Sequence, residues 1–253
     1  MWAKYRSYLI CAISVAWVFL STAFQHPENK PGNLKIRIAL VFNGHSLVLS
    51  SQEYITANGD TIFIDQFRAY LGNFRLLNAS GTEVNLAPTY HLLDAEVDSS
   101  MFLTFSNVPP GIYSELNFTI GTDSVVNVAG ALDGALDPVN GMYWAWNTGY
   151  INAKLNGRSP SCNTLHQGFE YHIGGYLSPY QSSRAVRLTT LTEIKNEEAT
   201  GLVLQADLAE WFKNPVVVDV SKTNSIVFPD KQSMLIADNY SDMFSVVQIK
   251  AEK

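Results

Sequence analysis

Alternation of apolar and polar residues constrains the fold of this chain more than any other feature. In residues 34–42 a large apolar residue occupies every second position: Leu34, Ile36, Ile38, Leu40 and Phe42. The side chains of a strand alternate between its two faces, so a period of two predicts a strand with one strongly apolar face. We expect these residues to pack inward while Lys35 and Arg37 face solvent. Residues 115–120 repeat the pattern.

Further strands are predicted at 61–67, 70–77, 90–97, 101–105, 186–188, 202–206 and 216–220, with turn sequences such as Pro109-Pro-Gly111 between them. Two segments favour short helices. Leu208, Trp211 and Phe212 have helical spacing behind a capping Asp207, and residues 233–244 form the second segment. The predicted fold class is therefore all-β, an antiparallel β-sandwich with one or two short helices and a long loop at 127–140.

The first residues predict export. Lys4 and Arg6 precede an apolar run that ends at Ser21-Thr-Ala23, which is typical of a signal peptide over residues 1–23. A membrane anchor is the alternative, but the run is shorter than the ~20 residues that span a bilayer. We expect a linker at 24–33, one domain at 34–253, no membrane span after cleavage, and a periplasmic or secreted location.

The charge of the chain limits its possible partners, and its cysteine content indicates what stabilises the fold. The chain has 17 Lys and Arg against 23 Asp and Glu; loss of two basic residues with the signal leaves 15 and a net charge of −8. This balance argues against nucleic acid as a partner. Cys162 is then the single remaining cysteine, so no intramolecular disulfide can form and the core must stabilise the fold.

An aromatic stretch follows the predicted loop. Gly141-Met-Tyr-Trp-Ala-Trp-Asn-Thr-Gly-Tyr150 contains Tyr143, Trp144, Trp146 and Tyr150 within eight residues. This is more aromatic surface than a connection usually needs for folding alone, and we expect a functional site here. If residues 143–147 are extended, both indoles share one face. We expect Trp146 to be the inner ring and Trp144 to cover it.

The histidines divide into two groups. His45 and His166 lie in turn-like sequences, where we expect them to be solvated. His91 and His172 lie in apolar, strand-like settings, where an imidazole is costly unless it is paired or coordinated. Each is either a satisfied core residue or a metal ligand. The sequence has no nucleophile elbow, phosphate loop or zinc motif, so we expect no enzyme activity.

Several segments together resemble the MbnP-like family of copper-binding proteins. The resemblance runs from about Leu34 to Phe244, and the tryptophan block with its Leu-Asp-Pro lead is its most specific part. The segments are residues 67–76, Tyr90-His-Leu-Leu93, Pro109-Pro-Gly-Ile-Tyr113, Ile120-Gly-Thr-Asp-Ser124, Leu136-Asp-Pro through Ile151, Phe169-Glu-Tyr-His-Ile-Gly-Gly175 and the Ala-Asp-Asn-Tyr-x-x-Met-Phe segment that ends at Phe244.

The resemblance implies a periplasmic or secreted copper-binding β-sandwich used in copper acquisition, storage or transfer. In such relatives a dihaem cytochrome c peroxidase-like protein of the MbnH type oxidises a tryptophan to kynurenine. The new aromatic amine then joins two histidines around Cu(I), and imidazole and amine ligands suit that metal. Carried over, the metal-binding residues are His91, His172 and one of Trp144 and Trp146.

A different class of function competes with copper binding. The aromatic stretch could instead form the platform of a non-enzymatic binding module that recognises a carbohydrate or a protein partner. The two readings predict different geometries. A shared copper site requires the side-chain nitrogens of His91 and His172 to lie within about 4 Å of each other, given metal–nitrogen bonds near ~2 Å. A separation above about 8 Å excludes it.

Overall fold

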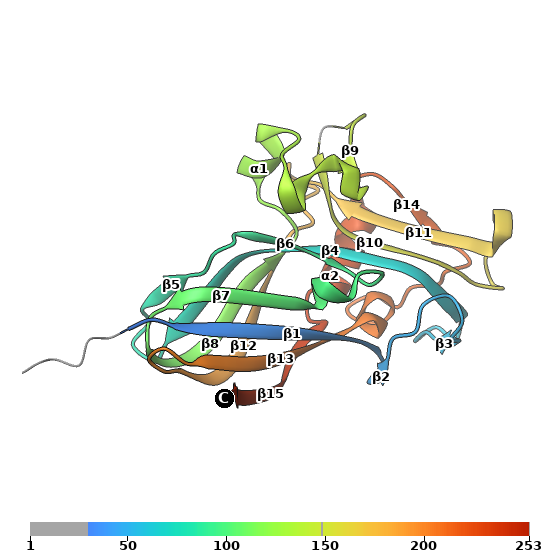
Figure 1. The fold of residues 1–253 in the computed structure, drawn as a ribbon. Helices are drawn as coiled ribbons and strands as arrows, with labels where there is room; N and C mark the ends of the chain where they lie inside the picture. Colours follow the sequence, from blue (N-terminus) through green and yellow to red (C-terminus); the bar gives the residue numbers. More distant parts are fainter. Residues whose placement is uncertain (1–29, 148, 253) are drawn as a thin grey trace, which may run out of the picture.

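The computed structural model describes residues 30–147 and 149–252, and within them two β-sheets pack face to face (Figure 1). The first sheet has the order β15-β13-β1-β2. The edge of β1 opposite β13 pairs with β2 near one end and with β7 near the other. Its strands are β1 (Gly32–Phe42), β2 (His45–Ser46), β7 (Phe102–Val108), β13 (Ala199–Asp207) and β15 (Phe244–Glu252). The predicted signal peptide and most of the predicted linker lie outside the described residues.

The second sheet is built on one long strand, β4 (Thr61–Asn78), and has the order β12-β8-β4-β10-β11-β14. The two strands predicted at 61–67 and 70–77 are therefore one. Short strands extend it: β3, β5 and β6 pair with β4, and β9 pairs with β10. The remaining bounds are β3 (Tyr54–Ile55), β5 (Glu83–Asn85), β6 (Tyr90–Asp94), β8 (Gly111–Ile120), β9 (Tyr143–Trp144), β10 (Gly149–Arg158), β11 (Gly168–Gly174), β12 (Arg184–Ile194) and β14 (Ser225–Ile226).

The main core lies between the sheets, and β1 confirms the predicted inner face. Leu34, Ile36 and Ile38 are buried, whereas Lys35 and Arg37 are exposed. The all-β sandwich is confirmed. The expectation of wholly antiparallel pairing is wrong, because β1 runs parallel to β13 and β11 runs parallel to β14.

Both predicted helices exist. The first is a 3-10 helix, η5 (Leu208–Phe212), in which the Asp207 carboxylate accepts from the Ala209 amide and Trp211 is fully buried. The second is α2 (Lys231–Tyr240), which ends before residue 244, the last residue of the predicted helix, where β15 begins. Further helical segments are α1 (Ser124–Ala129), η1 (Asp98–Met101), η2 (Gly134–Leu136), η3 (Pro138–Asn140) and η4 (Leu165–Gln167). Across the described ranges, no helix is both long and apolar enough for a bilayer crossing.

Residues 216–220, predicted as a strand, are irregular. The backbone of Val216 bonds to the side chain of Asn239 in α2, which accepts from its N–H and donates to its carbonyl. Val218 and Val220 are nevertheless buried in the core. The apolar alternation in this segment therefore reflects burial of its side chains. The Asn239 side chain, rather than a neighbouring strand, makes the hydrogen bonds of the Val216 backbone.

A cap of residues 124–147 covers part of the outer face of the second sheet (Figure 1). It comprises α1, η2, η3 and β9. Beneath it lies a second apolar cluster of Tyr70, Leu136, Met142, Trp144, Tyr150 and Ile151, separate from the main core. The Tyr150 hydroxyl lies within hydrogen-bond distance of the Leu132 amide and the carbonyls of Gly130 and Leu136. The backbone of the predicted long loop is therefore held by hydrogen bonds to the Tyr150 side chain.

Candidate metal centre

The indole of Trp144 fills the space that a side chain at position 174 would occupy. A Cβ built on Gly174 of β11 would come within 2.6 Å of the Trp144 ring and 2.7 Å of the Tyr150 carbonyl oxygen. The indole therefore occupies the space left by the missing side chain, and it is only 6% exposed. Because side chains two residues apart in a strand share a face, the indole lies on the face of β11 that carries His172.

His172 is half-buried on this outer face, in register with Lys154 of β10. The pKa of His172 is lowered to about 4, chiefly by burial and to a smaller extent by the nearby Lys154 ammonium. The imidazole is therefore neutral at physiological pH. A neutral imidazole carries the lone pair that metal coordination requires.

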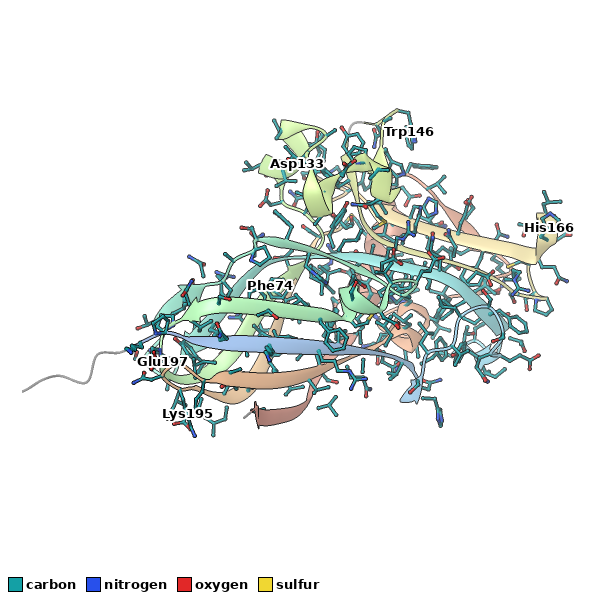
Figure 2. The ribbon with its side chains drawn as sticks, in the orientation of Figure 1. Phe74, Asp133, Trp146, His166, Lys195 and Glu197 are labelled. Atoms are coloured by element: carbon teal, nitrogen blue, oxygen red, sulfur yellow. The ribbon has the colours of Figure 1, made fainter. Side chains whose placement is uncertain are left out.

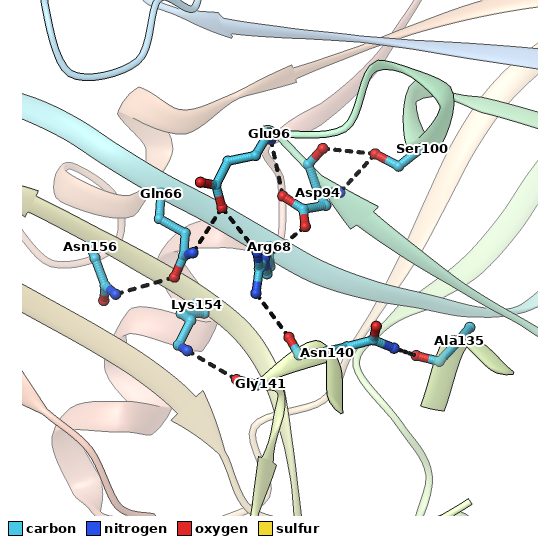
Figure 3. Close-up of polar contacts among 10 residues, drawn as sticks. All are labelled: Gln66, Arg68, Asp94, Glu96, Ser100, Ala135, Asn140, Gly141, Lys154 and Asn156. Atoms are coloured by element: carbon cyan, nitrogen blue, oxygen red, sulfur yellow. Dashed lines mark hydrogen bonds and ion pairs between the residues drawn. The ribbon is translucent and has the colours of Figure 1, made fainter. Parts of the chain in front are cut away.

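A chain of hydrogen bonds orients this imidazole, and Figure 3 shows its part from Asn156 to Glu96. His172 Nε2 lies 3.0 Å from the amide oxygen of Asn156. Asn156 Nδ2 donates to Gln66 Oε1 at 3.4 Å, and Gln66 Nε2 donates to the Glu96 carboxylate at 2.9 Å. Since each amide donates away from His172, Nε2 must carry the proton and Nδ1 is left with the lone pair. This is a carboxylate–histidine arrangement extended by two amides, of the kind that orients metal ligands.

Two cations fix the backbone that leads into Trp144. Arg68 Nη1 donates to the Asn140 carbonyl and Lys154 Nζ donates to the Gly141 carbonyl, both at 2.9 Å (Figure 3). Arg68 is held in turn by ion pairs to Asp94 at 2.8 Å and Glu96 at 2.9 Å. Burial lowers the pKa of Lys154, with a smaller contribution from Arg68. The sheet thus holds the end of the cap in a defined position above β10 and β11.

The two tryptophans exchange their predicted places. Residues 143–147 are not extended: β9 pairs Trp144 with Gly149, and residues 145–147 form the turn of a hairpin. Trp144 is consequently the inner ring. Trp146 is 66% exposed at the tip of the cap (Figure 2), and its ring centroid lies 5.6 Å from that of Trp144. The expectation of an inner Trp146 fails because the turn reverses the chain between the two residues.

His91 does not share this site. It lies in β6, which pairs with one edge of β4, whereas β10 and β11 lie beyond the other edge. Three strand spacings of ~4.8 Å separate the strands of the two histidines by roughly 14 Å, and the histidines are also offset along the strands. His91 also points toward the main core, since its neighbours Tyr90 and Leu92 pack on the cap cluster and its Nε2 lies 2.6 Å from the Ser100 carbonyl oxygen. The predicted pairing of His91 with His172 is wrong.

The remaining candidates lie elsewhere. His45 is exposed in β2, and His166 is exposed at the far tip of the β10–β11 connection (Figure 2). Cys162 is buried and donates to the Val220 carbonyl. Within residues 30–147 and 149–252, no three His, Cys, Asp or Glu side chains gather into a metal cluster.

Comparisons with known proteins identify the family of this chain. A family model described as MbnP matches residues 31–229. The chain belongs to the MbnP family. The solved structure of MbnP from Methylosinus trichosporium has a TM-score of 0.59 and 15% sequence identity, and the match covers 88% of this chain and 100% of that one. At this identity the likeness concerns the fold. No curated protein matches the chain.

Four residues that organise the site were missed by sequence reasoning: Gln66, Arg68, Lys154 and Asn156. Each occupies the polar side of an alternating strand, which predicts solvent exposure. A signal was present in the segment Ile151-Asn-Ala-Lys-Leu-Asn156, where Lys and Asn alternate with apolar residues directly after the aromatic stretch. Only the register of β4, β10 and β11 shows that these side chains converge on His172.

Proposed function

We propose that this chain binds copper outside the cytoplasm through His172 and a kynurenine formed from Trp144. The single observation that carries the proposal is the position of the Trp144 ring over Gly174, on the strand and face that carry His172. Family membership supports a copper-associated role. The location rests on the predicted signal peptide.

The donor chemistry fits copper. Imidazole suits copper, and Cu(I) accepts few, soft or borderline ligands. An indole nitrogen is a poor donor, whereas the aromatic amine of kynurenine has a lone pair. When bound, the metal would take that amine together with Nδ1 of His172, the nitrogen that the Asn156 amide leaves unprotonated.

Residues around these two donors have separate tasks. Burial keeps His172 neutral, and the Lys154 charge adds to this effect. Lys154 also holds the Gly141 carbonyl, so it contributes to the protonation state of one donor and to the position of the other. Trp146 covers Trp144 and remains largely exposed. An external oxidant, which the family resemblance assigns to a dihaem MbnH-type peroxidase, would therefore meet Trp146 first and Trp144 behind it.

A small donor set favours exchange of the metal. With His91 on the other face of the sheet, one histidine of the predicted pair rather than two would hold the metal. Positions around the metal stay open to an incoming ligand, which suits acquisition and transfer better than long-term storage. The protein acts in this proposal as a binding protein and not as an enzyme.

Paired histidine variants test the proposal. Protein recovered from its native host is loaded with Cu(I), and bound copper is measured by elemental analysis after dialysis. We expect His172→Ala to lose copper and the matched His91→Ala to retain it, with Tm checked for both. Equal loss in the two variants, or retention in both, contradicts the proposed site.

A further inference from the structure

A cleft of about 400 Å³ opens beside Trp144. Its lining comes from the described residues of β9 and its turn, from the start of β10, from the connection between β11 and β12, and from Pro229, which lies shortly before α2. Its lining residues are Trp144, Asn147, Gly149, Gly175, Tyr176, Leu177, Ser178, Tyr180 and Pro229. Trp144, the proposed kynurenine, lines the cleft, whereas His172 and the residues that orient it do not, so the cleft adjoins the proposed copper site and shares that one ring.

The walls are held rigidly. A Cβ on Gly175 would meet the Tyr180 carbonyl oxygen and Pro229, the latter at 2.9 Å, so the connection closes tightly on itself and on the start of α2. Ser182 donates its N–H to the Gly175 carbonyl at 3.1 Å, and Gln181 Nε2 donates to the Tyr176 carbonyl at 3.2 Å. The connection between β11 and β12 is therefore a preformed loop.

A buried amide network joins this loop to the other walls. Asn152 of β10 donates to the Ser182 hydroxyl at 2.9 Å and accepts from the Thr122 amide. Asn127 accepts from the Tyr150 amide, and the Tyr240 hydroxyl of α2 donates to the Ser182 carbonyl. Asn127, Asn152 and Ser182 are each at most 3% exposed. Buried polar networks that are fully paired make the surrounding structure rigid, and this one ties β10, α1 and α2 to the connection that follows β11.

The lining determines which ligands can bind. Its lining residues combine aromatic and apolar side chains, those of Tyr180, Tyr176 and Leu177, with two that carry hydrogen-bonding groups, Asn147 and Ser178. No Asp, Glu, Lys or Arg lines the cleft among the residues that the structure describes, so it offers no partner to an ionic ligand. Its volume lies at the lower end of the range for small-molecule sites, and a helix of ~10 Å diameter does not fit.

We infer that this cleft binds a neutral sugar. A pyranose presents an apolar C–H face, which can stack on the negative face of an aromatic ring, and hydroxyl groups at its edge, which can pair with an amide and a hydroxyl. Tyr180, 41% exposed at the rim, is the ring open to stacking. Asn147 and Ser178 supply the polar contacts, and the rigid walls keep the cost of ordering low.

Calorimetric titration with cellobiose, maltose and lactose tests this inference on the full mature chain, with glucuronic acid and glucosamine as charged probes. We expect at least one neutral disaccharide to bind with a millimolar Kd and the charged sugars not to bind. Tyr180→Ala should weaken that binding 10-fold or more, equivalent to about 1.4 kcal/mol. The matched control is Phe102→Ala, which removes an exposed ring on the other sheet and should leave the Kd unchanged.

Several results overturn the inference. Absence of binding by all three neutral sugars at concentrations about ten times a millimolar Kd is one. Binding that survives Tyr180→Ala, or that is lost in Phe102→Ala, places the sugar elsewhere. A dimer seen by light scattering that Tyr180→Ala dissociates, without sugar binding, identifies the cleft as a protein contact instead. Copper content of Tyr180→Ala protein should match the wild type, which separates this inference from the proposed function.

Discussion

Gly174→Ala is the substitution whose effect follows most directly from the structure. The added methyl would lie 2.6 and 2.8 Å from two Trp144 ring carbons and 2.7 Å from the Tyr150 carbonyl oxygen. The Tyr150 oxygen belongs to the neighbouring strand and cannot yield without moving the backbone. Overpacking of this kind costs about 1–3 kcal/mol. We therefore expect Gly174→Ala to lose about 2 kcal/mol of unfolding free energy and to displace the Trp144 ring.

Gly168→Ala is the matched control on the same strand. Its added methyl would meet the Leu165 carbonyl oxygen at 3.5 Å, an ordinary contact. We expect it to change stability by less than about 0.5 kcal/mol. Urea unfolding gives both free energies, and tryptophan fluorescence of the folded state reports the indole's surroundings. Equal stability of the two variants, with unchanged emission, would refute the placement of Trp144 over Gly174.

Three further predictions concern the core and the imidazole. Ile38→Asp should cost several kcal/mol by burying an unpaired charge, whereas Arg37→Gln should be near neutral; an unchanged thermal midpoint for Ile38→Asp would refute the assigned face. Folding lowers the pKa of His172 from 6.5 to about 4, so the unfolded chain binds the extra proton between these values. Unfolding free energy should thus fall as pH drops through this window, by up to ~1.4 kcal/mol per unit before solvent screening, and His172→Gln should flatten that slope in urea titrations at several pH values. Asn156→Leu removes the acceptor of His172 Nε2 and should weaken copper binding about 10- to 100-fold; competition titration showing wild-type affinity would exclude the orienting role.

The sequence predicted the sandwich because its strands bury one face each. Period-two alternation located β1 and the inner faces of β8 and β13, and it is a local property of each segment. The same alternation runs through β10, where Asn152, Lys154 and Asn156 alternate with apolar residues, but the aromatic stretch before it drew attention away from the strand. Parallel pairing of β1 with β13 joins segments more than 150 residues apart, and no local pattern encodes such a partner.

The candidate site was half predictable. His172 and the tryptophan pair stand out by residue type, but their geometry depends on the hairpin turn at 145–147 and on a missing side chain at Gly174. His91 has the same local signature as His172, an imidazole among apolar strand residues. What separates them is the register, which sets them on opposite faces with two strands between.

Peptide mapping of protein recovered from the native host tests the central claim most directly. Conversion of tryptophan to kynurenine replaces a ring carbon with oxygen, so tandem mass spectrometry of the peptide that spans Trp144 and Trp146 assigns the change to one residue. The account predicts a kynurenine at Trp144, an unmodified Trp146, and copper that is lost from His172→Ala. A kynurenine at Trp146 with Trp144 intact, or copper-loaded protein with both tryptophans unmodified, would contradict it.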